Sequence, residues 1–73
     1  MASDATLRTG DVLRVTSPHG ETMWFVESTA IAVSLDGLSP RDPMSIVNGP
    51  HDWVRIARGY TRLRALADFS LPF

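Results

Sequence analysis

The residues with the clearest chemical potential are two histidines, each placed close to an acidic residue. His19 lies two positions before Glu21, and His51 directly precedes Asp52. An imidazole near a carboxylate can bind a divalent metal or act as an acid–base couple. Both histidines, however, adjoin glycine or proline in predicted turns, where polar residues are tolerated, and their spacing matches no metal motif. We therefore expect no metal site and no cofactor.

Other catalytic arrangements are equally hard to find in the sequence. None of the serines lies in a nucleophile elbow, and the chain has no glycine-rich phosphate loop. Asp11 and Asp36 each adjoin a glycine, which is typical of turns. Two carboxylates placed for glycoside hydrolysis need a cleft that 73 residues scarcely provide. The sequence predicts a protein that is not an enzyme and has no catalytic residue.

Arginines close to aromatic residues are the strongest indication of a binding surface. Four arginines lie between positions 55 and 64, next to Trp53 and Tyr60. Arg, Trp and Tyr are enriched at the hot spots of protein interfaces. Earlier in the chain, Trp24 precedes Phe25; we assign Phe25 to the core, so Trp24 is expected to be an exposed anchor. The predicted partner-binding residues are Trp24, Trp53, Arg55, Arg58, Tyr60, Arg62 and Arg64. The alternative is a solvated surface whose charge the acidic half of the chain balances.

The distribution of charge argues against nucleic acid as the main partner. The net charge is −1, with three arginines and six acidic residues (−3) in residues 1–50, and four arginines and two acidic residues (+2) in residues 51–73. The isoelectric point of about 6.0 is low beside the value above about 9 that nucleic-acid-binding domains commonly show. There is no lysine, so each cation is a planar guanidinium suited to bidentate carboxylate or phosphate contacts.

Length and composition predict one globular domain over residues 1–73. The content of 44% hydrophobic and 21% charged residues is that of an ordinary folded protein. The lack of cysteine excludes disulfides and thiolate zinc sites. The longest apolar stretch, residues 29–35, is far shorter than the about 20 residues that span a bilayer. Residues 1–6 have no signal-peptide character. We expect a cytoplasmic monomer without membrane contact, and flexible ends at 1–6 and 70–73.

Glycines at positions 10, 20, 37, 49 and 59 divide the chain into short segments, a spacing typical of short strands in a small sheet or barrel. A hairpin is predicted from strands 11–16 and 21–29, joined through the turn at 17–20. Gly20 is expected to take the left-handed conformation that closes a three-residue loop. The second strand is apolar on both sides, so we expect both of its faces to be covered. Residues 30–35 then alternate, with Ile31, Val33 and Leu35 on one face.

The rest of the chain is more ambiguous. Pro40 and Pro43 predict a loop over residues 38–44. Residues 44–47 form either a short strand, which we slightly favour, or one helical turn capped by Asp42 with Pro43 at its first position. Residues 53–67 fit one amphipathic helix interrupted by Gly59, or a strand followed by a helix. We expect a strand to about Arg58 and a helix over residues 60–69.

These elements predict an α+β fold that is mainly β. The expected architecture is a small antiparallel sheet or partly open barrel of four or five short strands with one C-terminal helix.

In its minimal length, lack of a catalytic set, charge split between halves and arginine without lysine, the chain resembles small bacteriophage proteins that take over a host cell. In length and type it is similar to phage-encoded inhibitors of bacterial RNA polymerase. This resemblance covers overall dimensions and no particular residue. It implies a regulatory protein in the host cytoplasm that binds the polymerase, opposes initiation by the σ-containing enzyme and permits antitermination. The alternatives are a small β-barrel nucleic-acid-binding protein and a structural protein that assembles through its edge strands.

Overall fold

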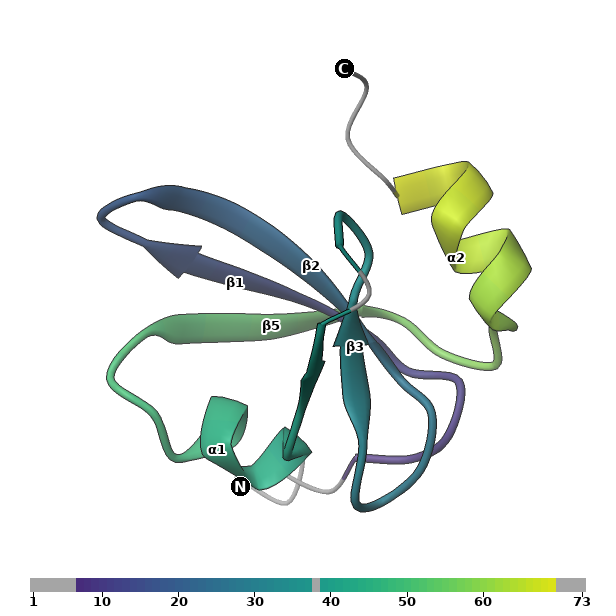
Figure 1. The fold of residues 1–73 in the computed structure, drawn as a ribbon, viewed down its shortest axis with the longest axis horizontal. Coiled ribbons are helices and arrows are strands. Elements are labelled where there is room, and N and C mark those ends of the chain that lie inside the picture. Colours follow the sequence, from purple (N-terminus) through teal and green to yellow (C-terminus); the bar gives the residue numbers. More distant parts are fainter. Residues whose placement is uncertain (1–6, 38, 70–73) are drawn as a thin grey trace.

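A computed structural model describes residues 7–37 and 39–69 of the chain. The flexible ends predicted at 1–6 and 70–73 lie outside the described residues. The described part forms an open five-stranded antiparallel sheet in the order β4-β3-β2-β1-β5, with a short helix before the last strand and another after it (Figure 1). The elements are β1 (Val12–Ser17), β2 (Gly20–Val26), β3 (Ala32–Ser34), β4 (Pro40–Arg41), α1 (Pro43–Val47), β5 (Asp52–Ala57) and α2 (Arg62–Phe69). The predicted mainly-β fold with a C-terminal helix is confirmed.

The β1–β2 hairpin follows the prediction closely. Ser17 and Gly20 pair directly, so the loop is Pro18 and His19 alone rather than the three residues expected. The Ser17 hydroxyl donates to the Gly20 carbonyl and accepts from the His19 amide, both at 3.2 Å. Gly20 has φ +123°, as its position in the turn predicted.

Strand β2 ends at Val26, three residues earlier than predicted, because the chain turns over residues 27–31. The Ile31 carbonyl accepts from the amides of Glu27 (2.9 Å) and Ser28 (3.1 Å), and the Ser28 hydroxyl accepts from the Ala30 amide (3.1 Å). Ile31 therefore belongs to the turn and is 44% exposed, so it does not extend the apolar face that Val33 and Leu35 form. The alternation predicted for the following residues is confirmed, since Val33 and Ala32 join different core clusters.

The segment between β3 and β5 contains the main departures from the prediction. Pro40 and Arg41 pair with β3, where a loop was expected. Residues 43–47 form α1, so the preference for a strand over 44–47 is wrong and the capped-helix alternative is correct. The Asp42 carboxylate accepts from the Met44 amide at 3.0 Å, and Pro43 occupies the start of the helix. Capping and the fixed φ of proline outweigh the strand preference of Ile46 and Val47.

The C-terminal third is a strand followed by a helix, as predicted. Strand β5 returns to pair antiparallel with β1, with an irregularity opposite Val12 and Leu13. Helix α2 begins at Arg62 and ends at Phe69, so it starts two residues later than predicted. In the described part of the chain, no helix is long and apolar enough to cross a bilayer.

Both faces of the sheet are apolar, and each carries one helix. On the α1 face, the buried cluster consists of Leu7, Leu13, Val26, Ala32 and Ile46. On the α2 face, it consists of Val12, Phe25, Val33, Leu35 and Ala65. Phe25 is 5% exposed, which confirms its assignment to the core. Because both faces of the sheet are covered, β2 is apolar at consecutive positions. Burial of each large apolar side chain stabilises the fold by about 1.5–3 kcal/mol.

Candidate partner-binding surface

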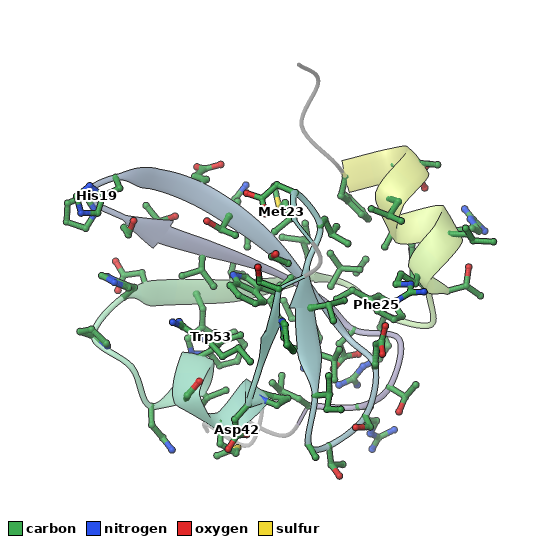
Figure 2. All side chains as sticks on the ribbon, in the orientation of Figure 1. His19, Met23, Phe25, Asp42 and Trp53 are labelled. Atoms are coloured by element: carbon green, nitrogen blue, oxygen red, sulfur yellow. The ribbon has the colours of Figure 1, made fainter. Side chains whose placement is uncertain are left out.

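The two tryptophans lie on the α1 face, half-buried against its core cluster. In the antiparallel register Trp24 is opposite Leu13, and Trp53 is opposite Val15. Leu13 and Val15 point to the same side of β1, so both indoles share that face. Figure 2 shows the Trp53 side chain running from β5 toward α1. Trp24 is therefore half-buried and packed against the core, rather than the exposed residue that was expected.

An arginine that the sequence prediction missed lies over Trp24. The guanidinium carbon of Arg41 is 5.6 Å from the ring centroid, within the range of a cation–π contact. Arg41 reaches this place because β4 pairs with β3, which brings Arg41 opposite Ala32. The local sequence around Arg41 has two prolines and reads as a loop, so only the strand pairing could have revealed the contact. Arg55 is also on the α1 face, opposite Leu13, and is half-buried.

Arg58 forms an ion pair with Asp11 at the end of the sheet where α2 begins. Its Nε donates to Asp11 Oδ1 at 2.9 Å, and its Nη2 donates to Asp11 Oδ2 at 3.3 Å. The Asp11 side chain is 0% exposed and also accepts from the Arg8 amide at 2.9 Å. A buried carboxylate needs such partners because burial of an unpaired charge is costly. Arg58, predicted as a partner-binding residue, is thus committed to an internal ion pair.

Tyr60 is placed between the sheet and helix α2. Its ring lies 5.3 Å from the Phe69 ring with a tilt of 43°, and the guanidinium of Arg64 is 5.0 Å from the Tyr60 centroid. Arg64 also lies 3.7 Å from Asp68, one turn along the helix. The Arg64 side chain remains 71% exposed. Tyr60 therefore packs in the α2-face cluster, and the exposed Arg64 guanidinium lies over its ring.

The outward side of α2 exposes an apolar residue between two arginines. Leu63 is 80% exposed, while Ala65 on the same helix is fully buried in the α2-face cluster. Arg62 donates to Glu27 at 2.9 Å across the surface. We call the exposed positions Arg62, Leu63, Arg64 and Ala67 the helix surface. Sequence reasoning missed Leu63, because in the alternative of one amphipathic helix over residues 53–67 it falls among the apolar residues of the buried side.

The seven predicted partner-binding residues thus fall in three places. Trp24, Trp53 and Arg55 lie on the α1 face; Arg58 is bound to Asp11; Tyr60, Arg62 and Arg64 lie at α2. The structure brings together the last three and separates them from the tryptophans by the thickness of the sheet. The two histidines do not assemble into a site: His19 is at the exposed tip of the β1–β2 hairpin (Figure 2). Over residues 7–37 and 39–69, no group of three His, Asp or Glu side chains is placed to hold a metal ion.

Comparison of the chain with models of protein families, with curated proteins and with solved structures gave no significant match.

Proposed function

We propose that this chain is a non-enzymatic regulatory protein that binds a larger protein through the helix surface of α2. The observation that carries the proposal is the 80% exposure of Leu63 between Arg62 and Arg64. Burial of a leucine side chain contributes about 1.5–3 kcal/mol. Flanking arginines add directional contacts to carboxylates of a partner. An apolar residue surrounded by arginines and next to a tyrosine is the composition typical of an interface hot spot.

The helix is well supported for this role by its opposite side. Ala65 is fully buried, and Leu66 and Phe69 pack against the α2-face cluster. The helix surface is therefore presented by a fixed element, which lowers the entropy lost on binding. The ion pair between Arg62 and Glu27 is exposed, with 49% and 34% of the side chains accessible. Such pairs contribute little to stability, so a partner carboxylate can replace Glu27 at small cost.

The proposed partner is a host macromolecular machine, with bacterial RNA polymerase as the specific candidate. This choice rests on the resemblance in size and type to phage-encoded polymerase inhibitors. The proposed activity is inhibition of transcription initiation in the host cytoplasm, with antitermination as an associated effect. A protein partner agrees with the near-neutral charge of the helix surface, where Arg62 and Arg64 face Glu27 and Asp68.

A nucleic-acid partner fits the structure less well. Arg58 is bound to the buried carboxylate of Asp11, which leaves Arg62 and Arg64 on α2 for phosphate contacts, and each of these lies beside an acidic residue. A binding mode of that kind predicts affinity that falls steeply with salt, because phosphate neutralisation releases counterions. Binding to a protein through Leu63 depends on apolar contact and predicts a much weaker dependence on salt.

The proposal can be tested by affinity capture from a bacterial lysate with the tagged chain, followed by mass spectrometry. The expected result is recovery of polymerase subunits by the wild-type chain and their loss with Leu63→Glu. The matched control is Met44→Glu on α1, since Met44 is 46% exposed and lies on the other face of the sheet. Capture of no polymerase subunit would contradict the proposal that RNA polymerase is the target. Equal capture by Leu63→Glu and Met44→Glu would contradict the proposal that the helix surface binds the partner.

A further inference from the structure

The two edges of the sheet differ in a way that points to a second interaction. The β4 edge has two residues, one of which is Pro40, and proline has no amide hydrogen to offer a neighbouring strand. The β5 edge has six residues and no proline. Within residues 7–37 and 39–69, no strand pairs with the outer side of β5. A free edge of this length presents unpaired backbone donors and acceptors to another strand.

The direction of those backbone groups follows from the hydrogen bonds of β1. The Val26 amide donates to the Asp11 carbonyl at 2.9 Å, so Asp11 directs its backbone toward β2. Residues of an antiparallel strand alternate in the side to which their backbone groups point. The odd-numbered residues of β1 therefore bond to β2, and its even-numbered residues, Arg14 among them, bond to β5.

The partners of those even-numbered residues on β5 are Val54, opposite Arg14, and Asp52, opposite Thr16. These two direct their backbone groups inward to β1. By the same alternation, the N–H and C=O groups of Trp53 and Arg55 point outward from the sheet. The exposed edge therefore has its hydrogen-bonding groups on the two residues whose side chains share the α1 face.

We propose that a second copy of this chain pairs with the β5 edge, antiparallel and centred on Val54. In this register Trp53 of each copy is opposite Arg55 of the other, so the same two residues exchange backbone hydrogen bonds and stack their side chains as cation–π pairs. On the opposite face Val54, which is 45% exposed, meets the Val54 of the second copy. The pairing extends the sheet through a two-fold axis and covers the edge on both faces.

Pairing of two β5 strands in the neighbouring registers is less favourable, so the register centred on Val54 is preferred. Centred on Arg55, the pairing would place two guanidinium groups directly opposite each other, and like charges at such positions destabilise a sheet. Centred on Trp53, it would place Asp52 opposite Val54. Arg55 is half-buried and has no carboxylate partner among the described residues. The indole of a second copy supplies the contact that Arg55 lacks.

This association does not depend on the proposed binding through α2, and it adds a dimer, formed at high concentration, to the monomer that the sequence led us to expect. Interfaces of one strand pair are small, and small interfaces are typical of weak, transient complexes. The dimer is therefore favoured at high concentration, and the chain at low concentration is a monomer.

The test is sedimentation velocity of the full chain from micromolar to millimolar concentration. The expected mass rises with concentration from 8.0 kDa toward twice that value. Arg55→Pro removes an outward amide without touching the β1 pairing, so it should keep the chain monomeric. Val54→Lys, at an exposed position, places like charges on the two-fold axis and should raise the dissociation constant about tenfold. It serves as the second test if Arg55→Pro lowers the folded fraction in circular dichroism.

Ile31→Lys is the control, since it adds the same charge at a residue that is 44% exposed in the turn between β2 and β3, away from the β5 edge, and should leave the association unchanged. A wild-type chain that stays monomeric at millimolar concentration would overturn the proposal. An association that Val54→Lys leaves intact, or that Ile31→Lys weakens equally, would also overturn it, because the contact would then lie elsewhere.

Discussion

The guanidinium of Arg58 is bonded to the fully buried carboxylate of Asp11, 47 residues earlier in the chain, with 2.9 Å between Nε and Oδ1. The contact joins the segment before β1 to the segment after β5, at the end of the sheet where α2 begins. Tyr60, two residues later, donates its amide to the Gly10 carbonyl at 3.0 Å. The position of α2, and so of the helix surface, depends on this junction.

Arg58→Ala should lower the free energy of unfolding by about 1–3 kcal/mol, because it removes charged hydrogen bonds from a buried acceptor. Urea denaturation followed by circular dichroism measures the change. Arg64→Ala is the matched control: its pair with Asp68 is exposed, and such pairs contribute about 0–1 kcal/mol. Equal losses in the two variants would show that the buried Arg58–Asp11 pair stabilises the fold no more than an exposed pair does.

Gly10→Ala should destabilise the chain more than Gly20→Ala does. Both glycines have positive φ, +96° and +123°, so both changes introduce backbone strain of about 1–2 kcal/mol. A Cβ at Gly10 would also lie 3.0 Å from the Tyr60 carbonyl oxygen, whereas one at Gly20 meets nothing within 4 Å. Thermal melting of the two variants measures the difference. A lower midpoint for Gly20→Ala would contradict the close approach of Gly10 and Tyr60.

Asp42→Ala should cost about 0.5–2 kcal/mol, the usual effect of removing a helix N-cap. The Asp42 carboxylate accepts the Met44 amide, and α1 places Ile46 in the α1-face cluster. Asp36→Ala, an exposed residue in the turn after β3, provides the comparison and should change little. Chemical denaturation of both variants checks the result. No loss with Asp42→Ala would mean that the cap does not hold α1 in place.

How far the sequence predicted this fold depends on the range of the interactions involved. The hairpin at Gly20 and the helix at 62–69 were predictable, because turn residues and helix formers act on their near neighbours. Strand β4 was not, since Arg41 and Pro40 become a strand only by pairing with β3. Helix α1 was one of the two alternatives predicted for residues 44–47. The cap at Asp42 outweighs the β-branched residues that favoured a strand.

The candidate site was predictable only in composition. Clustering of arginines near Tyr60 indicated the region, and Tyr60, Arg62 and Arg64 do lie together. The role of Arg58 was hidden because its carboxylate partner is distant in sequence. Trp24 and Trp53 are brought to a common face by register across β1, which no local pattern reveals. Leu63 became a candidate only when the helix was shown to bury Ala65 instead.

Phe25→Ala should cost about 3–5 kcal/mol, as large-to-small aromatic changes in a core do. Phe25 is 5% exposed and packs in the α2-face cluster with Ala65, so the loss would also loosen α2. Thr22→Ala, a half-buried position on the same strand, should have a much smaller effect. Circular dichroism at increasing temperature compares the two. A stable Phe25→Ala variant would contradict the assignment of this residue to the core.

The most direct test of the proposed function is an equilibrium titration of the labelled chain with purified bacterial RNA polymerase, with and without σ, at several salt concentrations. The proposed function predicts saturable binding of the wild-type chain, weak dependence on salt and unchanged affinity for Met44→Glu. It also predicts that Leu63→Glu weakens binding by at least about tenfold, since it loses a buried leucine contact of about 1.5–3 kcal/mol. Absence of binding to either form of the polymerase, or equal affinity of the wild-type chain and Leu63→Glu, would contradict it.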